Sequence, residues 1–220
     1  MTFTFDIAFK SVPGSEHAYQ DRLLVNRQKM LFAVADGVSI PDYGDSAKAA
    51  ERALSMLADL FSMDLKHAID QVNNEIAKIR KTENLGLTTL TAIHIFQEDN
   101  AIFATFANVG DSPAYLLRNG RLSIITELDT NGLYLTSAIG EEQVEAHCKK
   151  QKIENGDMLI AATDGIEPYL SKELLVEMLR RNGSAEDIVD RIFSIAAENK
   201  MSYDDDKTLI CIIAHAGGEI

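Results

Sequence analysis

An apolar run that ends in Asp-Gly occurs twice in this chain and constrains its fold more than any other feature. The first copy is residues 31–38, LFAVADGV, and the second is residues 159–166, LIAATDGI. A short apolar run bounded by turn residues is typical of a strand buried on both faces. A carboxylate at the end of such a strand is held rigidly at the rim of the core, and the glycine after it lets the backbone turn. The pattern therefore predicts that Asp36 and Asp164 can be brought to one rim of a layered β-structure.

The order of the remaining patterns predicts an α+β fold. Apolar and polar residues alternate over 3–10, and further segments along the chain are rich in β-forming residues. These segments are 23–25, 30–35, 88–96, 102–109, 114–117, 122–125, 147–153, 158–163 and 208–214. Helical spacing predicts two consecutive helices over 47–61 and 65–79, and two more over 171–181 and 184–199. Because helices follow each other in pairs, we expect two antiparallel β-sheets packed as a central sandwich, flanked by a pair of antiparallel helices on each side.

Short local signals predict where some of these elements begin and turn. Asp45 or Ser46 can cap the first helix, and residues 184–187 resemble a capping box at the start of the last helix. The Asn-Gly dipeptide at 119–120 predicts a tight hairpin between the strands on either side of it.

Two further expectations concern the second half of the chain. The segments 147–153 and 158–163 are expected to form a strand pair across Asn-Gly-Asp at 155–157. Residues 127–145 are irregular and polar, and are expected to form a loop over one end of the sheets.

The length and net charge of the chain limit the classes of protein to which it can belong. The chain has 220 residues, which suits one sizeable domain spanning 1–220. The formal net charge is −13, so broad binding to nucleic acid or to an anionic membrane is disfavoured. A solvated acidic surface explains most of this charge, and a cluster of acids built to hold cations explains part of it.

The N-terminus and the cysteines favour a cytoplasmic protein. The first six residues lack a basic segment followed by an apolar one, so no signal peptide is expected, and no apolar run approaches the length of a membrane span. Cys148 and Cys211 have no paired spacing, which is typical of reduced structural thiols.

Acids next to predicted strand ends form the constellation that carries chemistry. They are Asp21, Asp36, Asp111, Asp164 and Asp205. Mg²⁺ and Mn²⁺ take about six oxygen ligands, several of them waters, and two such ions bridged by one carboxylate share a water whose pKa they lower. The sequence has no histidine pair at zinc spacing, no glycine-rich phosphate loop and no Gly-x-Ser-x-Gly elbow that would indicate another chemistry.

The motifs around these acids resemble those of the PP2C (PPM) family of metal-dependent serine/threonine protein phosphatases, in its compact bacterial type. The matching stretches occur in the family's order and cover nearly the whole chain. They are Gln20-Asp21, VADG at 34–37, GLTTL at 86–90, NVGDS at 108–112, ATDG at 162–165 and DDKT at 205–208. The resemblance implies a β-sandwich flanked by helix pairs, which agrees with the order of elements above.

The resemblance also assigns roles by position. It implies that Asp36 bridges two metal ions, that the Gly37 carbonyl binds one of them, and that Asp164 and Asp205 bind the second. Asp21 would hold metal-bound water, and Asp111 matches an aspartate that helps to hold a third, looser ion. The implied reaction is direct attack of a metal-bridging hydroxide on phosphorus, with Asp36, Asp164 and Asp205 as the catalytic set and Mg²⁺ or Mn²⁺ as cofactor.

The resemblance further implies a phosphorylated protein as substrate, a cognate Ser/Thr kinase as a further candidate partner, and a role in signalling. The chain departs from the family's pattern mainly where substrate phosphate would bind. Glu16 stands at the position of a phosphate-binding arginine, Gln20 replaces a glutamate, and Ser39 and Pro113 replace a glycine and an arginine. Arg22 is close in sequence but would point to the opposite face from Asp21.

Several alternatives remain open at this point. His17 precedes Gln20-Asp21 and could protonate a leaving group, or it could be a surface histidine. Asp204 or Asp206 could serve in place of Asp205 if the loop shifts by one residue. The whole chain could instead be a regulatory module that recognises a phosphoprotein or kinase with little turnover, or a hydrolase of small phosphate esters.

Overall fold

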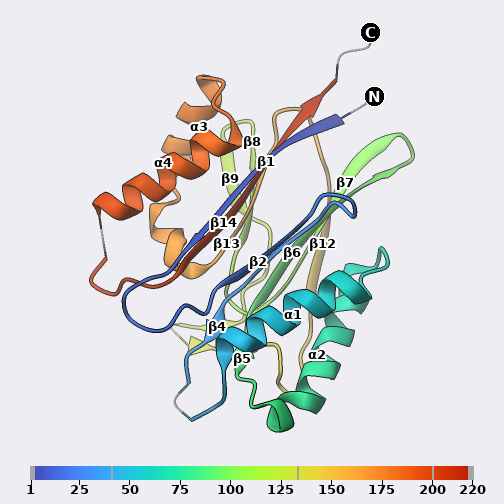
Figure 1. Cartoon of the computed structure of the whole chain (residues 1–220). Coiled ribbons are helices and arrows are strands. Elements are labelled where there is room, and N and C mark those ends of the chain that lie inside the picture. The colour runs from blue at the N-terminus through green and yellow to red at the C-terminus, as the bar shows by residue number, and fades with distance from the viewer. Residues whose placement is uncertain (1–2, 41, 133, 200, 218–220) are drawn as a thin grey trace.

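The computed structural model describes residues 3–40, 42–132, 134–199 and 201–217. Two five-stranded antiparallel sheets face each other at its centre (Figure 1). The first has the order β1 (Phe3–Val12), β14 (Lys207–Ala216), β13 (Met158–Ala162), β8 (Ala114–Arg118) and β9 (Arg121–Ile124). The second has the order β12 (His147–Lys152), β7 (Ala101–Val109), β6 (Leu90–Glu98), β3 (Leu31–Ala35) and β2 (Arg22–Asn26).

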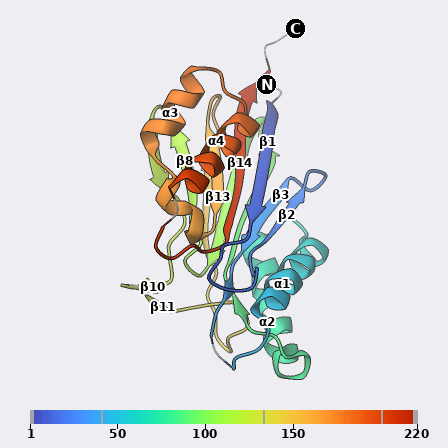
Figure 2. The same cartoon turned by 60° about the vertical axis from the view of Figure 1, so that its left-hand side comes forward.

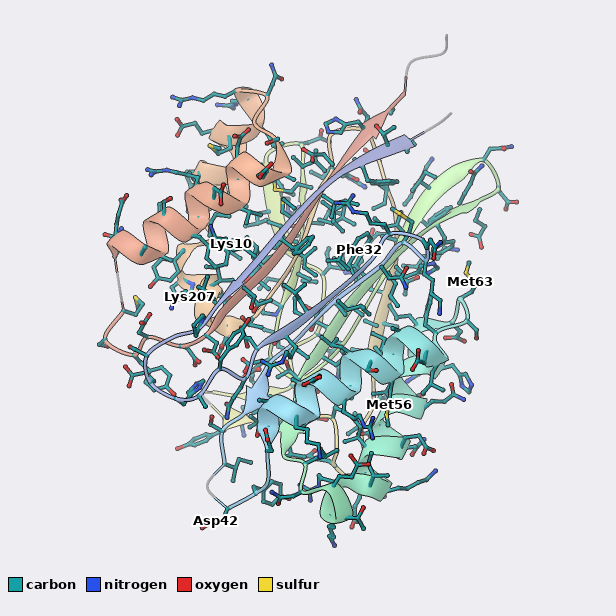
Figure 3. The ribbon with its side chains drawn as sticks, in the orientation of Figure 1. Lys10, Phe32, Asp42, Met56, Met63 and Lys207 are labelled. Carbon is teal, nitrogen blue, oxygen red and sulfur yellow. The ribbon has the colours of Figure 1, made fainter. Side chains whose placement is uncertain are left out.

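A helix pair covers the outer face of each sheet, so the predicted α+β sandwich is confirmed. Helices α1 (Ser46–Leu60) and α2 (Leu65–Glu83) pack on the sheet that contains β3, and α3 (Lys172–Arg180) and α4 (Ala185–Glu198) pack on the sheet that contains β14 (Figures 1 and 2). Three apolar layers result, one under each helix pair and one between the sheets. Phe32 belongs to the layer between the sheets and is fully buried (Figure 3).

The predicted helix caps and the predicted hairpin turn are present in the structure. The Asp45 carboxylate accepts a hydrogen bond from the Lys48 backbone N–H at 2.9 Å and caps α1. Ser184 and Asp187 form a reciprocal capping box at the start of α4. Asn119 and Gly120 have φ of 51° and 75°, the left-handed values that a two-residue hairpin between β8 and β9 requires.

The predicted pairing of 147–153 with 158–163 is wrong. Strand β12 pairs with β7 in one sheet, whereas β13 lies between β8 and β14 in the other. The composition explains the difference, because β12 is a polar, largely exposed edge strand and β13 is apolar and buried on both faces. The chain crosses between the sheets at Asp157, whose carboxylate accepts hydrogen bonds from Arg118 and from the Glu154 N–H.

The segment 127–145 is not wholly irregular. It contains a short hairpin of β10 (Thr130–Asn131) and β11 (Tyr134–Leu135), while Leu133 lies outside the described residues. Two more short strands, β4 (Gly37–Val38) and β5 (Leu87–Thr88), pair at the same end of the sandwich. After β13 the chain enters the 3₁₀ helix η1 (Asp164–Tyr169), which the sequence patterns did not predict. Among the described helices, none combines the length and apolarity that crossing a bilayer would need.

Candidate metal centre

Four aspartates from both sheets meet at one end of the sandwich. Asp36 follows β3, Asp111 follows β7, Asp164 follows β13, and Asp205 precedes β14. Together with His17, Gly37, Val38, Ser39, Thr89, Leu135 and Tyr203 they line one cavity of about 170 Å³. These four predicted acids therefore do converge. Two of them adjoin strands of one sheet, β3 and β7, and the other two adjoin strands of the other sheet, β13 and β14.

The Asp36 carboxylate is affected by the charges of all four other candidate aspartates. Burial raises its pKa well above the ordinary range, and the charges of Asp21, Asp164, Asp205 and Asp111 raise it further. Its backbone is pinned, because its N–H bonds to the Thr89 hydroxyl at 3.0 Å and its carbonyl accepts from the Thr88 hydroxyl at 2.8 Å. A rigid carboxylate among like charges is costly unless a cation lies beside it.

The pKa of Asp164 is raised by the same causes. Burial raises its pKa to about 6, and the charges of Asp111 and Asp205 add to the effect, while hydrogen bonds with Asp36 and the Gly165 backbone oppose it. Asp111 also has a raised pKa, chiefly from burial, with contributions from Glu167 and Asp129.

Asp21 lies behind this lining and is fully buried. Its Oδ2 accepts a hydrogen bond from the Thr163 hydroxyl at 2.8 Å, whereas its Oδ1 has no hydrogen-bond partner among the described residues. Burial raises its pKa to about 7, the hydroxyls of Thr208 and Thr163 offset part of this, and the charges of Asp206 and Asp164 add to it. An orphaned buried carboxylate oxygen is rare in a folded protein and calls for a ligand or an ordered water.

Gly37 is required by close packing at the entrance to the cavity. A Cβ built on it would lie 2.8 Å from the Ser46 backbone carbonyl and 2.9 Å from the Cβ of Gln20. Gln20 in turn accepts a hydrogen bond from the Ser39 hydroxyl at 2.6 Å, which fixes the segment that follows Gly37.

The structure separates the three consecutive aspartates before β14. The Asp204 carboxylate pairs with Lys207 at 2.6 Å and bonds to Ser15. The Asp206 carboxylate accepts three backbone N–H groups, from Gly14, Gln20 and Asp21. Both side chains hold loops together, so Asp205 is the member of the run that lines the cavity.

The sequence left His17 open between a surface histidine and a site residue, and the structure places it in the cavity lining. Its Nε2 lies 2.8 Å from Asp205 Oδ1, and its Nδ1 lies 2.9 Å from the Ala18 carbonyl oxygen. Burial lowers its pKa, but the hydrogen bond to Ala18 and the Asp205 and Asp206 charges outweigh this, so the net pKa is raised. The position of His17 in a loop between strands left no periodic signal to reveal this contact.

Arg22 and His94 do not line the cavity. Arg22 donates to the carbonyls of Tyr19 and Asp21 and stacks on the Tyr19 ring. His94 is buried between Phe61 and Phe96, and burial lowers its pKa. The residues that line the cavity include no lysine or arginine.

The donor set fits hard divalent cations. Carboxylate oxygens are ligands that Mg²⁺ and Mn²⁺ prefer, and the cavity lining holds no lysine or arginine to balance the charges of these aspartates.

Comparison with known proteins identifies the family to which the chain belongs. The family described as Stage II sporulation protein E (SpoIIE) matches residues 45–215. The solved catalytic domain of the serine/threonine protein phosphatase PstP, in complex with two manganese ions, is 25% identical and superposes with a TM-score of 0.79 over 98% of this chain and 100% of that chain. PstP/Ppp of Mycobacterium tuberculosis is 23% identical with a TM-score of 0.78 over 96% and 99% of the two chains.

A curated relative supports the match over a shorter stretch. The protein phosphatase PTC7 homolog fig of Drosophila ananassae is 29% identical over 116 residues, which are 47% of this chain and 34% of that protein. This chain thus spans about a third of the length of the curated relative that it matches.

The fold and the family match define a PP2C-type phosphatase domain. This chain belongs to the SpoIIE family, and its structural neighbours are PPM serine/threonine protein phosphatases.

Proposed function

We propose that this chain removes phosphate from phosphoserine and phosphothreonine in proteins with the help of two divalent cations, Mg²⁺ or Mn²⁺. The observation that carries the proposal is the convergence of four aspartates from both sheets on one cavity. Asp36, the Gly37 carbonyl, Asp164 and Asp205 would hold the two ions. Asp21 would act through water, and Asp111 would contribute to a third ion.

The bound cations would supply a bridging hydroxide as nucleophile and neutralise the phosphate oxygens. The chain's own contribution is to fix the carboxylates. The hydroxyls of Thr88 and Thr89 hold the backbone of Asp36, and the three N–H bonds of Asp206 tie the Asp205 loop to residues 14–21. Fixed carboxylates keep a reacting phosphate in line with its attacking group, which contributes through proximity and orientation.

The proposal includes one catalytic domain over 1–220, with a phosphoprotein as substrate in the cytoplasm. The continuous apolar layers between helices and sheets support a single domain, and the described cysteines Cys148 and Cys211 are free. A cognate Ser/Thr kinase would be the natural source of the substrate.

The test is hydrolysis of p-nitrophenyl phosphate and of a phosphothreonine peptide with Mn²⁺, comparing the native chain with Asp36→Asn. We expect metal-dependent turnover that falls by roughly 10³-fold or more in the variant, a loss of about 4 kcal/mol of transition-state stabilisation. The matched control is Asp59→Asn, an exposed acid on α1, which should leave turnover unchanged. Turnover that is independent of metal, or unaffected by Asp36→Asn, contradicts the proposal.

A second candidate is a regulatory module on the same fold that binds a phosphoprotein or a kinase with little turnover. It is favoured by Glu16, which stands where the family places a phosphate-binding arginine, and by a cavity lining without lysine or arginine. Tight binding of a phosphoprotein together with negligible turnover in Mn²⁺ would favour this module over the enzyme. Turnover of p-nitrophenyl phosphate without any turnover of phosphopeptides would favour a small phosphate ester as substrate.

A further inference from the structure

His17 meets the metal centre in an arrangement that the family-based assignment does not use. Its ring enters the same cavity as Asp36, Asp164 and Asp205, and only about a fifth of its side chain, 19%, is exposed. Its Nε2 lies 2.8 Å from Asp205 Oδ1. This contact joins residues 188 positions apart in the sequence, so the fold itself builds it.

The other ring nitrogen decides what Nε2 can do. Nδ1 lies 2.9 Å from the Ala18 carbonyl oxygen, which can only accept a hydrogen bond, so Nδ1 carries a proton. The Asp205 carboxylate also only accepts, so the 2.8 Å contact is a donation from Nε2–H, and a cation bound between the two groups would take the place of that proton. The donation of Nδ1–H to a backbone carbonyl is the arrangement that metal-ligating histidines use to fix their ring orientation and tautomer, leaving Nε2 for the ion.

The separation of the two donors also suits a shared ion. In an octahedral site with donors about 2.1 Å from the ion, neighbouring donor atoms are roughly 3 Å apart. The 2.8 Å between His17 Nε2 and Asp205 Oδ1 is close to this value. Asp206 also lies near the ring, but its oxygens are occupied by three backbone N–H groups, so the remaining ligands must come from the cavity.

We infer that His17 is a direct nitrogen ligand of the metal ion that Asp205 binds. The inference rests on the proposed metal centre and adds an imidazole to a ligand set otherwise made of oxygen. Imidazole favours first-row transition metals over Mg²⁺, whereas carboxylate and water serve Mg²⁺ and Mn²⁺ alike. His17 therefore biases this ion position toward Mn²⁺ or another transition metal and away from Mg²⁺.

The deciding measurement is electron spin-echo envelope modulation of the full chain loaded with Mn²⁺. We expect nitrogen coupling to the Mn²⁺ electron spin, and we expect its lines to change when the protein is made with ¹⁵N-labelled histidine. Among the described residues His17 is the one histidine that lines the cavity, so this labelling test on the native chain stands even if a variant folds poorly. Bound Mn²⁺ without histidine nitrogen coupling overturns the inference.

Two variants sharpen the test. His17→Ala should remove the nitrogen coupling and weaken Mn²⁺ binding in calorimetry by roughly tenfold or more, with a smaller loss for Mg²⁺. His67→Ala, an exposed histidine on α2, should keep both the coupling and the affinity. Coupling that persists in His17→Ala refutes the ligand role, whereas a native chain that binds no Mn²⁺ at all refutes the proposed metal centre as well.

Discussion

Two buried aspartates, Asp157 and Asp21, differ in how the charge of the carboxylate is balanced. Asp157 is 1% exposed and Asp21 is fully buried. Arg118 binds both oxygens of Asp157, from Nε at 2.8 Å and from Nη2 at 2.6 Å, and the Glu154 N–H adds a third bond. Asp21 has one hydroxyl bond, an orphaned oxygen, and Asp206 and Asp164 as charged neighbours. At the sheet crossing the chain supplies its own cation, whereas the balancing charge for Asp21 would come from the proposed metal centre.

The largest effect on activity should come from removing a carboxylate charge from the cavity that the four aspartates line. Asp164→Asn should lower Mn²⁺-dependent turnover by roughly 10³-fold, about 4 kcal/mol, while the metal-free protein unfolds at the same or a higher temperature. Phosphatase assays and calorimetric melting of the metal-free protein measure the two quantities. A variant that lost stability in parallel with activity would show that Asp164 holds the fold together in the way that Asp157 does.

The reverse pattern is expected at the sheet crossing. Arg118→Ala leaves Asp157 buried without its bidentate partner, so we expect a loss of about 3 kcal/mol in the free energy of unfolding. Turnover per folded molecule should be unchanged. Lys78→Ala is the control, because its pair with Glu75 is exposed on α2 and should contribute less than about 1 kcal/mol. Equal losses of unfolding free energy in Arg118→Ala and Lys78→Ala would contradict the expected difference between the buried and the exposed ion pair.

Added metal should stabilise the rim. At roughly 100 times the dissociation constant, Mn²⁺ should raise the free energy of unfolding by about 2.7 kcal/mol, and a chelator should reverse the gain. Arg118→Ala should show the same gain, since its defect is elsewhere, and Asp36→Asn should show little. Thermal melts at a series of Mn²⁺ concentrations measure this, and a gain retained in Asp36→Asn would contradict the assignment of that residue.

The smallest effect concerns pH in the metal-free protein. Because the folded-state pKa of Asp21 is raised to about 7, the folded state binds more protons than the unfolded state between about pH 4 and pH 7, and stability falls as pH rises through that window. Asp21→Asn removes this term, so at pH 7.5 without metal the variant should be more stable than the native chain. At pH 4 the difference should vanish. Urea unfolding at both pH values tests this, and an unchanged difference at pH 4 would locate the cause elsewhere.

The sequence predicted most of the fold because its local signals agree with its long-range pattern. The buried runs 31–35 and 158–162, the helix pairs and the caps at Asp45 and Ser184 all formed as expected. The partnering of β12 and β13 was not predictable in the same way, because adjacency in sequence favours a hairpin. The choice of sheet depends on which face each strand buries and on the Arg118–Asp157 pair across 39 residues.

The site was predicted to the extent that turn chemistry marks it. Asp36 and Asp164 carry the Asp-Gly pattern. Asp205 was chosen by its match to the family motif, and the contacts of Asp204 with Lys207 and of Asp206 with backbone N–H groups agree with that choice. Asp21 could be named, but its orphaned oxygen depends on burial behind β13 and β14. His17 lies in a loop without periodicity, so its contact with Asp205 had no sequence signal at all.

The place of β14 in its sheet bears on how the molecule is made. This strand comes after every other described strand in the chain, yet it lies between β1 and β13. Synthesis runs from the N-terminus, so β1 waits unpaired until residues 207–216 leave the ribosome, and Asp205 arrives just before them. A nascent or truncated chain that lacks these residues therefore lacks a finished sheet and one of the proposed metal ligands, so we expect it to have no metal-dependent activity until this strand has been translated.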